Sequence, residues 1–476
     1  MNSRRHLILQ WAVVLGFLVS VPFIRFAIGA LPSDDGLRHV AQAISGRPWT
    51  DVTFIREDCR MDHSPGWNWL LAEVHRLTGM EQKGLLDLAV YGLFALYVAV
   101  GLGISPAPIF WMASIAVIYA SGEVAIVGRL LHGRPFALSM AGWLLALHLW
   151  TKPRMTRLDL FLTAAICGAC AWVHGTWYPW AALGAGLLLA RRRGRALAFT
   201  AAWAIGTWAG AALTGHPLEF LWNSIRILGR LEGEHRPLSM LQAEVQPWFI
   251  RWQTLIPVAA LAYLSWKLKS RMVEREKLLL PVLAICAGLG LLNFRMWCDW
   301  GLPCLTLLAA YRLKGLTEAI NLRPEGWVMS AATAGCGAIW LAGVAMSGTM
   351  FYASRSDTWG PDTPAAWLPE PGSVVYNHTI PSFCQTYYNH PDMNWKMAIG
   401  FEFTFAPKEE YDTFLLLADS PKKYVDAVVR RMTPKDRILL NMAEPPPNSN
   451  VLWFKAGPTT WLGKLKPAQG ALPAPG

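Results

Sequence analysis

The sequence predicts a mainly α-helical polytopic membrane protein, with about eleven transmembrane helices and a small soluble α/β domain near its carboxyl end. Three observations predict this class. The 476 residues are 53% hydrophobic and only 16% charged, and the mean hydropathy is +0.28. Apolar stretches of about 15–25 residues, long enough to cross a bilayer, recur through residues 1–351. Beyond residue 372 the apolar runs shorten to the length of strands.

The membrane domain is predicted from residue 1 to residue 351. Its expected spans are 7–30, 84–104, 107–122, 135–150, 158–174, 176–190, 196–213, 253–267, 277–294, 299–312 and 327–350. The first is too long for a cleavable signal peptide, lacks a small-residue cleavage site and is followed by further spans.

Basic residues predict the orientation of these spans. Five basic segments fall on one side if every span crosses once: 2–6, 151–157, 191–195, 267–277 and 312–326. By the positive-inside rule that side is the cytoplasm. The amino terminus is then cytoplasmic and the C-terminal domain lies outside. We therefore expect an integral protein of the bacterial inner (plasma) membrane, with a periplasmic or extracellular C-terminal domain. The net charge of +11 is accounted for by these segments, so nucleic acid is not an expected partner.

The remaining segments lie outside the membrane in this topology. External loops are expected at 32–83 and 214–252, and the second could cover a site or lie flat in the interface. A Pro/Gly-rich linker is expected at 352–371, an α/β domain at 372–466 and a disordered tail at 467–476. Strand-like runs fall at 373–378, 396–405, 412–418, 436–441 and 451–456, and a helix is expected at 421–432.

Cysteine spacing gives no clear metal site. Cys167 and Cys170 form a CxxC inside an apolar span without further ligands nearby, so we expect them to serve helix packing. Cys59, Cys298 and Cys384 fall in expected external segments, and sequence alone cannot say whether any two of them pair.

Asp34 and Asp35 follow directly on the first span. Either could cap the helix that starts at "PSDDGLRHVAQAI". Two adjacent carboxylates exceed what a cap requires, and ionisable groups at a membrane edge are candidates for function. A carboxylate pair can act as a general base or hold a divalent cation such as Mg²⁺ or Mn²⁺.

The residues that follow resemble a known family. The acid pair, a short helix, the turn His63-Ser64-Pro65 and the helix "WNWLLAEVHRLTG" look like the first external loop of GT-C glycosyltransferases. That superfamily includes the protein O-mannosyltransferases and the aminoarabinose transferases of lipid A. The resemblance covers residues 1–215, where "VGRLLHGRPFALSM" is also similar to a family junction. Here His63 replaces the family's lysine, which leaves the donor-phosphate contact at that position open.

The resemblance implies an enzyme that moves a hexosyl or pentosyl group from a polyprenyl-phosphate donor to an acceptor, with inversion. Asp34 matches the position of the family's catalytic base, and Asp35 would support it through a metal or a hydrogen bond. The leaving phosphate gains negative charge, so cationic groups should surround it. The expected substrate-binding residues are His39, His63, Glu123, Arg129, His132 and Arg134. For Arg129 and Arg134 a lipid anchor, and for His39 simple packing, stay open as alternatives.

Two other classes compete with this interpretation. One is a transporter or flippase of lipid-linked glycans, and the other is a non-catalytic envelope assembly protein. A transporter more often carries ionisable residues at the bilayer midplane, whereas these collect at its edge. A scaffold has little need of the acid pair. The expected partners are the sugar donor, a lipid, glycan or protein acceptor, and membrane lipids.

Overall fold

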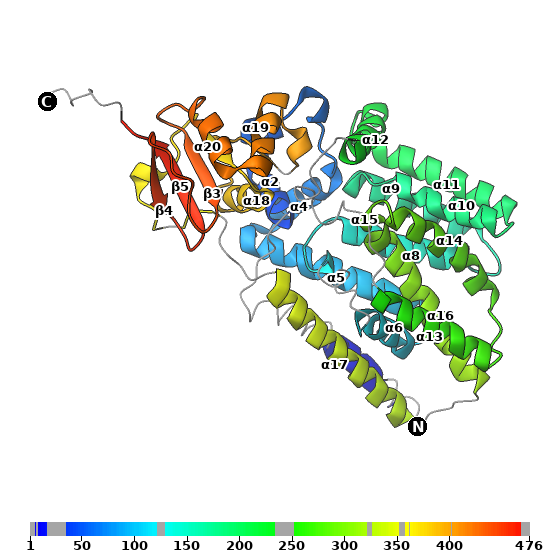
Figure 1. Cartoon of the computed structure of the whole chain (residues 1–476). Coiled ribbons are helices and arrows are strands. Elements are labelled where there is room, and N and C mark those ends of the chain that lie inside the picture. Colours follow the sequence, from blue (N-terminus) through cyan, green and yellow to red (C-terminus); the bar gives the residue numbers. More distant parts are fainter. Residues whose placement is uncertain are drawn as a thin grey trace, which may run out of the picture.

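The structure is a computed structural model that describes residues 5, 8–16, 35–120, 129–233, 252–320, 326–351, 358–360, 362–400 and 402–467. A large bundle of helices is joined at one end to a smaller region that contains a β-sheet (Figure 1). Helices α2 (Asp35–Ser45) and α4 (Pro65–Thr78) lie between the bundle and the sheet region. Residues 17–34 and 121–128, which include Asp34 and Glu123, lie outside the described residues.

Each expected span from 84–104 onward coincides with a helix. These helices are α5 (Gln82–Ile104), α6 (Pro108–Ala120), α8 (Phe136–Trp150), α9 (Arg157–His174), α10 (Ala181–Leu189), α11 (Arg193–Ala212), α13 (Trp252–Lys267), α14 (Glu274–Gly290), α16 (Leu302–Ala319) and α17 (Gly326–Phe351). The first expected span is helical over residues 8–16, and its remainder falls among the residues left undescribed.

Length and composition support fewer crossings than the sequence pattern predicts. Among the described residues, α5 and α9 are each long and apolar enough to cross a membrane. A third crossing is added if α11 and Pro217–Ile227 form one span, although they meet at an angle of 106°. The count of about eleven therefore stays a prediction.

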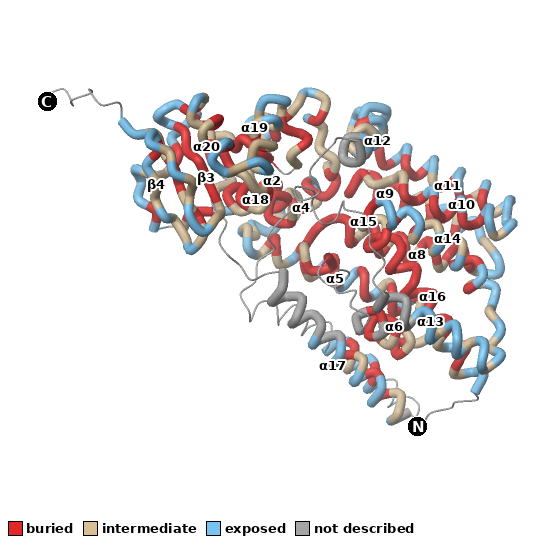
Figure 2. The backbone as a smooth tube through the Cα atoms, in the orientation of Figure 1, coloured by how far each residue is buried: buried red, intermediate tan, exposed pale blue. Residues whose placement is uncertain are grey.

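The bundle exposes large apolar side chains on its outer surface. Phe161 of α9, Leu197 of α11 and Ile205 of α11 are 68%, 74% and 67% exposed. Exposed residues continue along α10, α11 and α14, while the interior of the bundle is buried (Figure 2). Extensive exposed apolar surface marks a surface that faces something other than water, and lipid is the partner expected for a helical bundle.

Helices α9 and α11 pack through small residues. A side chain added at Gly206 would place its Cβ 2.1 Å from the carbonyl oxygen of Ala164, and one at Gly210 would lie 2.1 Å from that of Gly168. The backbones thus approach closely, as small residues allow in membrane helices. The neighbouring Cys167 and Cys170 are buried, and all eight cysteines of the chain are free thiols.

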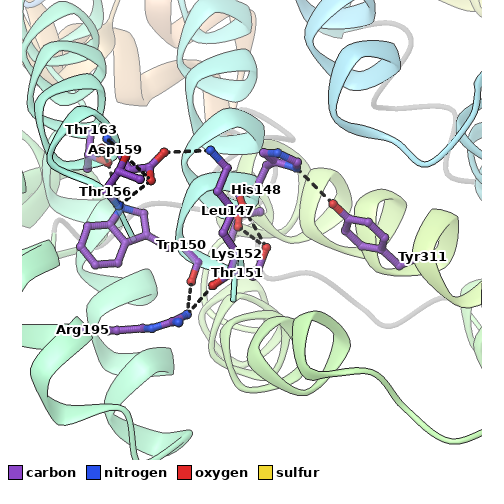
Figure 3. A network of polar contacts seen from close by, with 10 residues as sticks. All are labelled: Leu147, His148, Trp150, Thr151, Lys152, Thr156, Asp159, Thr163, Arg195 and Tyr311. Carbon is purple, nitrogen blue, oxygen red and sulfur yellow. Dashed lines mark hydrogen bonds and ion pairs between the residues drawn. The ribbon is translucent and has the colours of Figure 1, made fainter. Parts of the chain in front are cut away.

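Four of the basic segments meet at one end of the bundle, which we call the inner end. Arg195 donates to the carbonyl oxygens of Trp150 (3.2 Å) and Lys152 (2.8 Å), and Lys152 pairs with Asp159 at 2.8 Å (Figure 3). Arg195 also donates to the carbonyl oxygen of Pro153 at 2.6 Å. Asp159 also completes a capping box with Thr156 at the start of α9. The prediction that these segments lie on one side of a membrane requires such a meeting.

A second buried cluster at the inner end joins α13, α14 and α16. Arg312 donates to Glu276 (2.9 Å), to the Ser265 hydroxyl (2.8 Å) and to the carbonyl oxygen of Ser270 (2.9 Å). Arg312 and Glu276 are both buried, so their mutual bonds replace water that neither can reach.

The opposite end, which we call the outer end, is built from shorter elements. These are α2 (Asp35–Ser45), α3 (Trp49–Val52), η1 (Glu57–Cys59), α4 (Pro65–Thr78), η2 (Tyr178–Trp180), α12 (Pro217–Gly233), α15 (Phe294–Met296) and the π-helical turn η4 (Trp297–Gly301). Helix α4 begins with Pro65 at its first position and ends at Gly79, whose φ of +66° closes the last turn.

The C-terminal region forms a five-stranded mixed sheet with the order β2-β1-β3-β5-β4. The strands are β1 (Val374–Asn377), β2 (Lys396–Met397), β3 (Arg437–Asn441), β4 (Val451–Lys455) and β5 (Thr460–Leu465). Strands β1, β2 and β3 are parallel, whereas β5 pairs antiparallel with β3 and with β4. The connecting elements are η5 (Ala365–Trp367), α18 (Ile380–Asn389), η6 (Phe403–Phe405), α19 (Lys408–Asp419) and α20 (Pro421–Val429).

Two expectations for this region are wrong in detail. The run at 412–418 is helical, because Phe414 and Leu417 are one turn apart on α19 and pack inward together. The run at 396–405 is a strand only at Lys396 and Met397. Strand β5 was not expected, since its Gly463 and Lys464 obscure the apolar pattern. The proposed domain and linker boundaries stay predictions.

The C-terminal region packs directly on the segment that follows the first expected span. Helix α18 lies against α2, where the Tyr387 hydroxyl bonds Ser45 (2.6 Å) and Gln42 (2.9 Å). Residues of both regions share one hydrophobic core. The sheet is therefore attached to the outer end through buried side chains.

Candidate functional site

Asp35 lies at the centre of a buried ion-pair cluster. Helix α2 places Asp35 in its first turn and Arg38 one turn later, where Arg38 Nε donates to Asp35 Oδ1 at 2.8 Å. Arg134, in the turn before α8, holds Asp35 Oδ2 at 2.7 Å. Burial raises the pKa of the Asp35 carboxyl, but Arg134 and Arg38 more than offset this and hold that pKa well below its ordinary value. Asp35 is therefore an ionised anchor for two arginines and a weak base.

His63 takes the place of a lysine in the family pattern, and its contacts indicate a neutral ring. Arg38 Nη2 lies 3.3 Å from His63 Nε2. Because a guanidinium can only donate, Nε2 accepts and the proton of the neutral ring is on Nδ1. Burial, followed by the charge of Arg38, lowers the pKa of His63 to about 4. The positive charge of a lysine is thus replaced here by a hydrogen-bond acceptor.

A chain of side chains fixes His39 beside this cluster. Asn68 of α4 donates its amide to Asp62, and its Oδ1 lies 2.7 Å from His39 Nδ1. Asp62 also accepts from the backbone N–H of Ser64 at 2.9 Å. Since the Asn68 oxygen accepts, His39 carries its proton on Nδ1. Burial, followed by Arg38, lowers the pKa of His39 well below its ordinary value, so this ring is also neutral.

Arg129 is engaged by an acid that the sequence did not single out. Its Nε and Nη2 donate to the two oxygens of Asp299 at 2.6 and 2.8 Å, a bidentate pair buried among α8, η4 and the turn before α8. The guanidinium also lies over the Phe136 ring, 4.0 Å from its centre. The backbone carbonyl of His132 faces Gly36, where an added Cβ would come within 2.2 Å. Arg129 and His132 thus support the site through packing and through the ion pair with Asp299.

Two cavities meet at the outer end. The first, of about 100 Å³, is polar and is lined by Asp35, Arg38, His39, His63 and Arg134. The second, of about 560 Å³, is mostly apolar and is lined by side chains of α8, α10 and α14. Both cavities are lined by His174, Thr176, Tyr178 and Arg295. These four residues therefore mark a junction between a charged chamber and an apolar one.

Part of the lining of the polar cavity comes from segments that lie far from α2 in the sequence. Ser224 and Ile227 of α12 line it, which places part of the expected loop 214–252 over the site. Glu402 and Phe405 line it from the C-terminal region. The ring of Phe405 meets that of His63 edge to face at 6.4 Å.

The structure brings together only some of the residues expected at the site. Asp35, His39, His63 and Arg134 line one cavity, while Arg129 and His132 support it. The residues missed from the sequence are Arg38, His174, Arg295, Asp299 and Glu402. Arg38 had a signal, because it falls one helical turn after Asp35. Arg295 and Asp299 flank an aromatic turn at the end of an expected span, the type of position where the other charges were sought.

Metal binding by Asp34 and Asp35 stays a prediction. Among the described residues no group of three or more His, Cys, Asp or Glu side chains is placed to hold a metal ion. Both oxygens of Asp35 already accept from guanidinium groups, whose charge opposes a nearby cation.

The fold has a solved counterpart. The crystal structure of ArnT from Cupriavidus metallidurans in the apo state aligns over 97% of this chain and 98% of that chain, with a TM-score of 0.56. The two sequences are 13% identical over that alignment, so the likeness is one of fold. No protein-family model and no curated protein sequence matches the chain.

Proposed function

We propose that this protein is an integral-membrane glycosyltransferase of the GT-C type. It moves a sugar from a polyprenyl-phosphate donor to an acceptor hydroxyl or amine at the outer face of a bacterial inner membrane. The observation that carries the proposal is the junction of a charged cavity of about 100 Å³ with an apolar cavity of about 560 Å³. An amphiphilic donor needs such a pair of adjoining chambers.

The junction suggests how the donor is placed. The lipid chain lies in the apolar cavity and the sugar in the polar one. The phosphate then lies beside Arg295, which lines both. As the bond from the sugar to the phosphate breaks, charge grows on the phosphate oxygens, and a fixed guanidinium stabilises it. Arg295 lines both cavities and Arg134 lines the polar one, whereas Arg129 lines neither, so Arg295 and Arg134 are better placed for this role.

The proposed reaction is a direct displacement at the anomeric carbon, which inverts its configuration. The acceptor oxygen or nitrogen forms the new bond, the polyprenyl phosphate leaves, and the acceptor proton goes to a carboxylate. Asp35 is poorly suited to take that proton, because two arginines stabilise its ionised form. This supports the assignment of the base to Asp34, with Asp35 as the residue that holds Arg38 and Arg134 in place.

The fold and the sequence support the proposal independently. The chain shares the fold of ArnT over nearly its full length. The first 215 residues resemble the GT-C family, which includes the aminoarabinose transferases of lipid A, and the structure places the resembling residues Asp35, His63 and Arg134 in one cavity.

Mass spectrometry of lipids and envelope glycans from a strain that lacks the gene tests this function. A polyprenyl-phosphate sugar should accumulate and one glycan or lipid modification should disappear. The purified protein in lipid vesicles should transfer the sugar from that donor to envelope material of the same strain, with its lipids retained. Movement of the intact donor across the vesicle membrane without loss of its sugar would instead identify a flippase.

A further inference from the structure

Glu402 reaches the polar cavity from the C-terminal region. It precedes the short helix η6 (Phe403–Phe405), and both Glu402 and Phe405 line the cavity. The backbone N–H of Arg56 donates to the Phe405 carbonyl oxygen at 2.8 Å. The C-terminal region is therefore part of the wall of the site.

Two sets of hydrogen bonds hold the chain shortly before Glu402. The Thr53 hydroxyl and the Phe54 N–H donate to the Met397 carbonyl oxygen at 3.0 and 3.2 Å. The buried Asn377 side chain exchanges two hydrogen bonds with the backbone of Ile399, at 2.9 and 3.0 Å. These contacts fix Met397 and Ile399, which lie shortly before Glu402 in the chain, and a binding residue needs such a rigid support.

The charges of the cavity give Glu402 a distinct role. Asp35 accepts from Arg38 and Arg134, and Glu402 Oε1 accepts from the Thr404 hydroxyl at 3.4 Å. Arg295 lines both cavities, whereas Glu402 lines only the polar cavity, in the wall supplied by the C-terminal region. A carboxylate in that wall attracts hydroxyl or ammonium groups and repels anions.

We propose that Glu402 binds the acceptor. Its carboxylate accepts a hydrogen bond from a hydroxyl or ammonium group of the acceptor and so orients the attacking atom toward the sugar. The site then selects acceptors that present hydrogen-bond donors near the nucleophile, and it rejects those with a phosphate or carboxylate there. This inference rests on the proposed glycosyltransferase function.

The test compares the wild-type protein with Glu402→Gln, which keeps the size of the side chain and removes its charge. The donor is the lipid-linked sugar that accumulates in the deletion strain, and the acceptor is the envelope of that strain with its lipids retained. Replacement of a charged by a neutral hydrogen-bond partner should raise the half-saturating amount of envelope about tenfold. The half-saturating concentration of donor should change less than that of envelope.

Glu444→Gln is the matched control, because Glu444 is an exposed carboxylate in the same region. It should behave as wild type. An unchanged dependence on envelope in Glu402→Gln, or an equal change for donor and envelope, would overturn the inference. If Glu402→Gln does not fold, Glu402→Asp should show the same selective shift, and its absence would count equally against the proposal. A wild-type protein that transfers no sugar would instead refute the proposed function itself.

Discussion

The two ends of the helical bundle hold arginine side chains in different surroundings. At the inner end, Arg195 and Arg312 donate to carbonyl oxygens and to a carboxylate at bonding distance. At the outer end, Arg38, Arg134 and Arg295 line a cavity. Both ends satisfy the need of a buried charge for partners. The difference teaches that a buried arginine indicates a site only where an accessible space lies beside it.

The largest effect is expected from Asp34→Asn. The change keeps size and helix-capping ability and removes a base, so transfer should fall by about two to four orders of magnitude with little loss of stability. Turnover of the purified protein with the lipid-linked donor measures this. Asp159→Asn makes the same chemical change at the inner end and should leave turnover unaltered. Full activity of a folded Asp34→Asn protein would favour a capping role and remove the base from this position.

Loss of one partner of a buried ion pair should reduce transfer activity at the outer end and leave it unchanged at the inner end. Asp35→Asn leaves Arg38 and Arg134 without their carboxylate, and Glu276→Gln does the same to Arg312. Each should lower the free energy of unfolding by roughly 3–5 kcal/mol, measured by denaturant titration in detergent. Transfer per folded molecule should fall only for Asp35→Asn. Equal losses of transfer in both variants would contradict a functional distinction between the two ends.

As the pH falls, the stability of the protein should decrease before the Asp35 carboxyl at the outer end is protonated. The pKa of His63 is about 4 in the folded protein and about 6.5 when unfolded, so the unfolded chain binds more protons between these values. Stability should therefore fall by about 3 kcal/mol as the pH drops from 6.5 to 4. The pKa of Asp35 is lowered instead, so its contribution is lost only below about pH 4.

Thermal melts of the wild type and His63→Gln at several pH values measure this loss. Between pH 4 and 6.5 the melting temperature of the variant should fall less steeply than that of the wild type. Part of the fall should remain, because the pKa values of His39 and His378 are also lowered. His63→Lys would restore the residue type of the family pattern beside Arg38. It should lower the melting temperature at neutral pH, because it places two positive charges where the native ring accepts a hydrogen bond. A more stable His63→Lys protein would contradict the neutral-ring assignment.

The smallest effect is expected from two tyrosine hydroxyls. Tyr387→Phe removes bonds to Ser45 and Gln42, and Tyr311→Phe removes bonds to His148 and Arg275. Each should lower the free energy of unfolding by about 1 kcal/mol. Of these two tyrosines, Tyr387 is the one that joins the C-terminal region to α2. Loss of its hydroxyl, and not of the Tyr311 hydroxyl, should therefore also shift the half-saturating amount of acceptor. A shift in both variants would remove the distinction.

The fold was predictable where an apolar run in the sequence is long enough to indicate a single type of secondary structure. Apolar runs of about 15–25 residues locate the ten helices that coincide with expected spans, because no other structure hides so many backbone groups in an apolar medium. The strand-length run at 412–418 could not be assigned by the same reasoning, because a short apolar run suits either a strand or a helix. The eleven crossings and their orientation remain predictions of the charge pattern.

The site was predictable where one helix or turn holds neighbouring residues. Asp35, His39 and His63 belong to one short stretch, and a family resemblance located them. Arg295 and Glu402 enter the same cavity from segments far along the chain. No spacing in the sequence reports such contacts, because they depend on how helices and sheet pack. Asp299 was missed for the same reason, although its pair with Arg129 is bidentate.

The hydrogen bond between Thr53 and Met397 joins residues 344 positions apart. A ribosome makes the helices that hold the arginines long before it makes the segment that carries Glu402. The chamber consequently stays without part of its wall until the last stretch of the chain has been synthesised and has docked. An incomplete chain, released early or cut by a protease, would keep its arginines yet lack that wall. The polar cavity can therefore be complete only in a chain that has been made at least as far as Phe405.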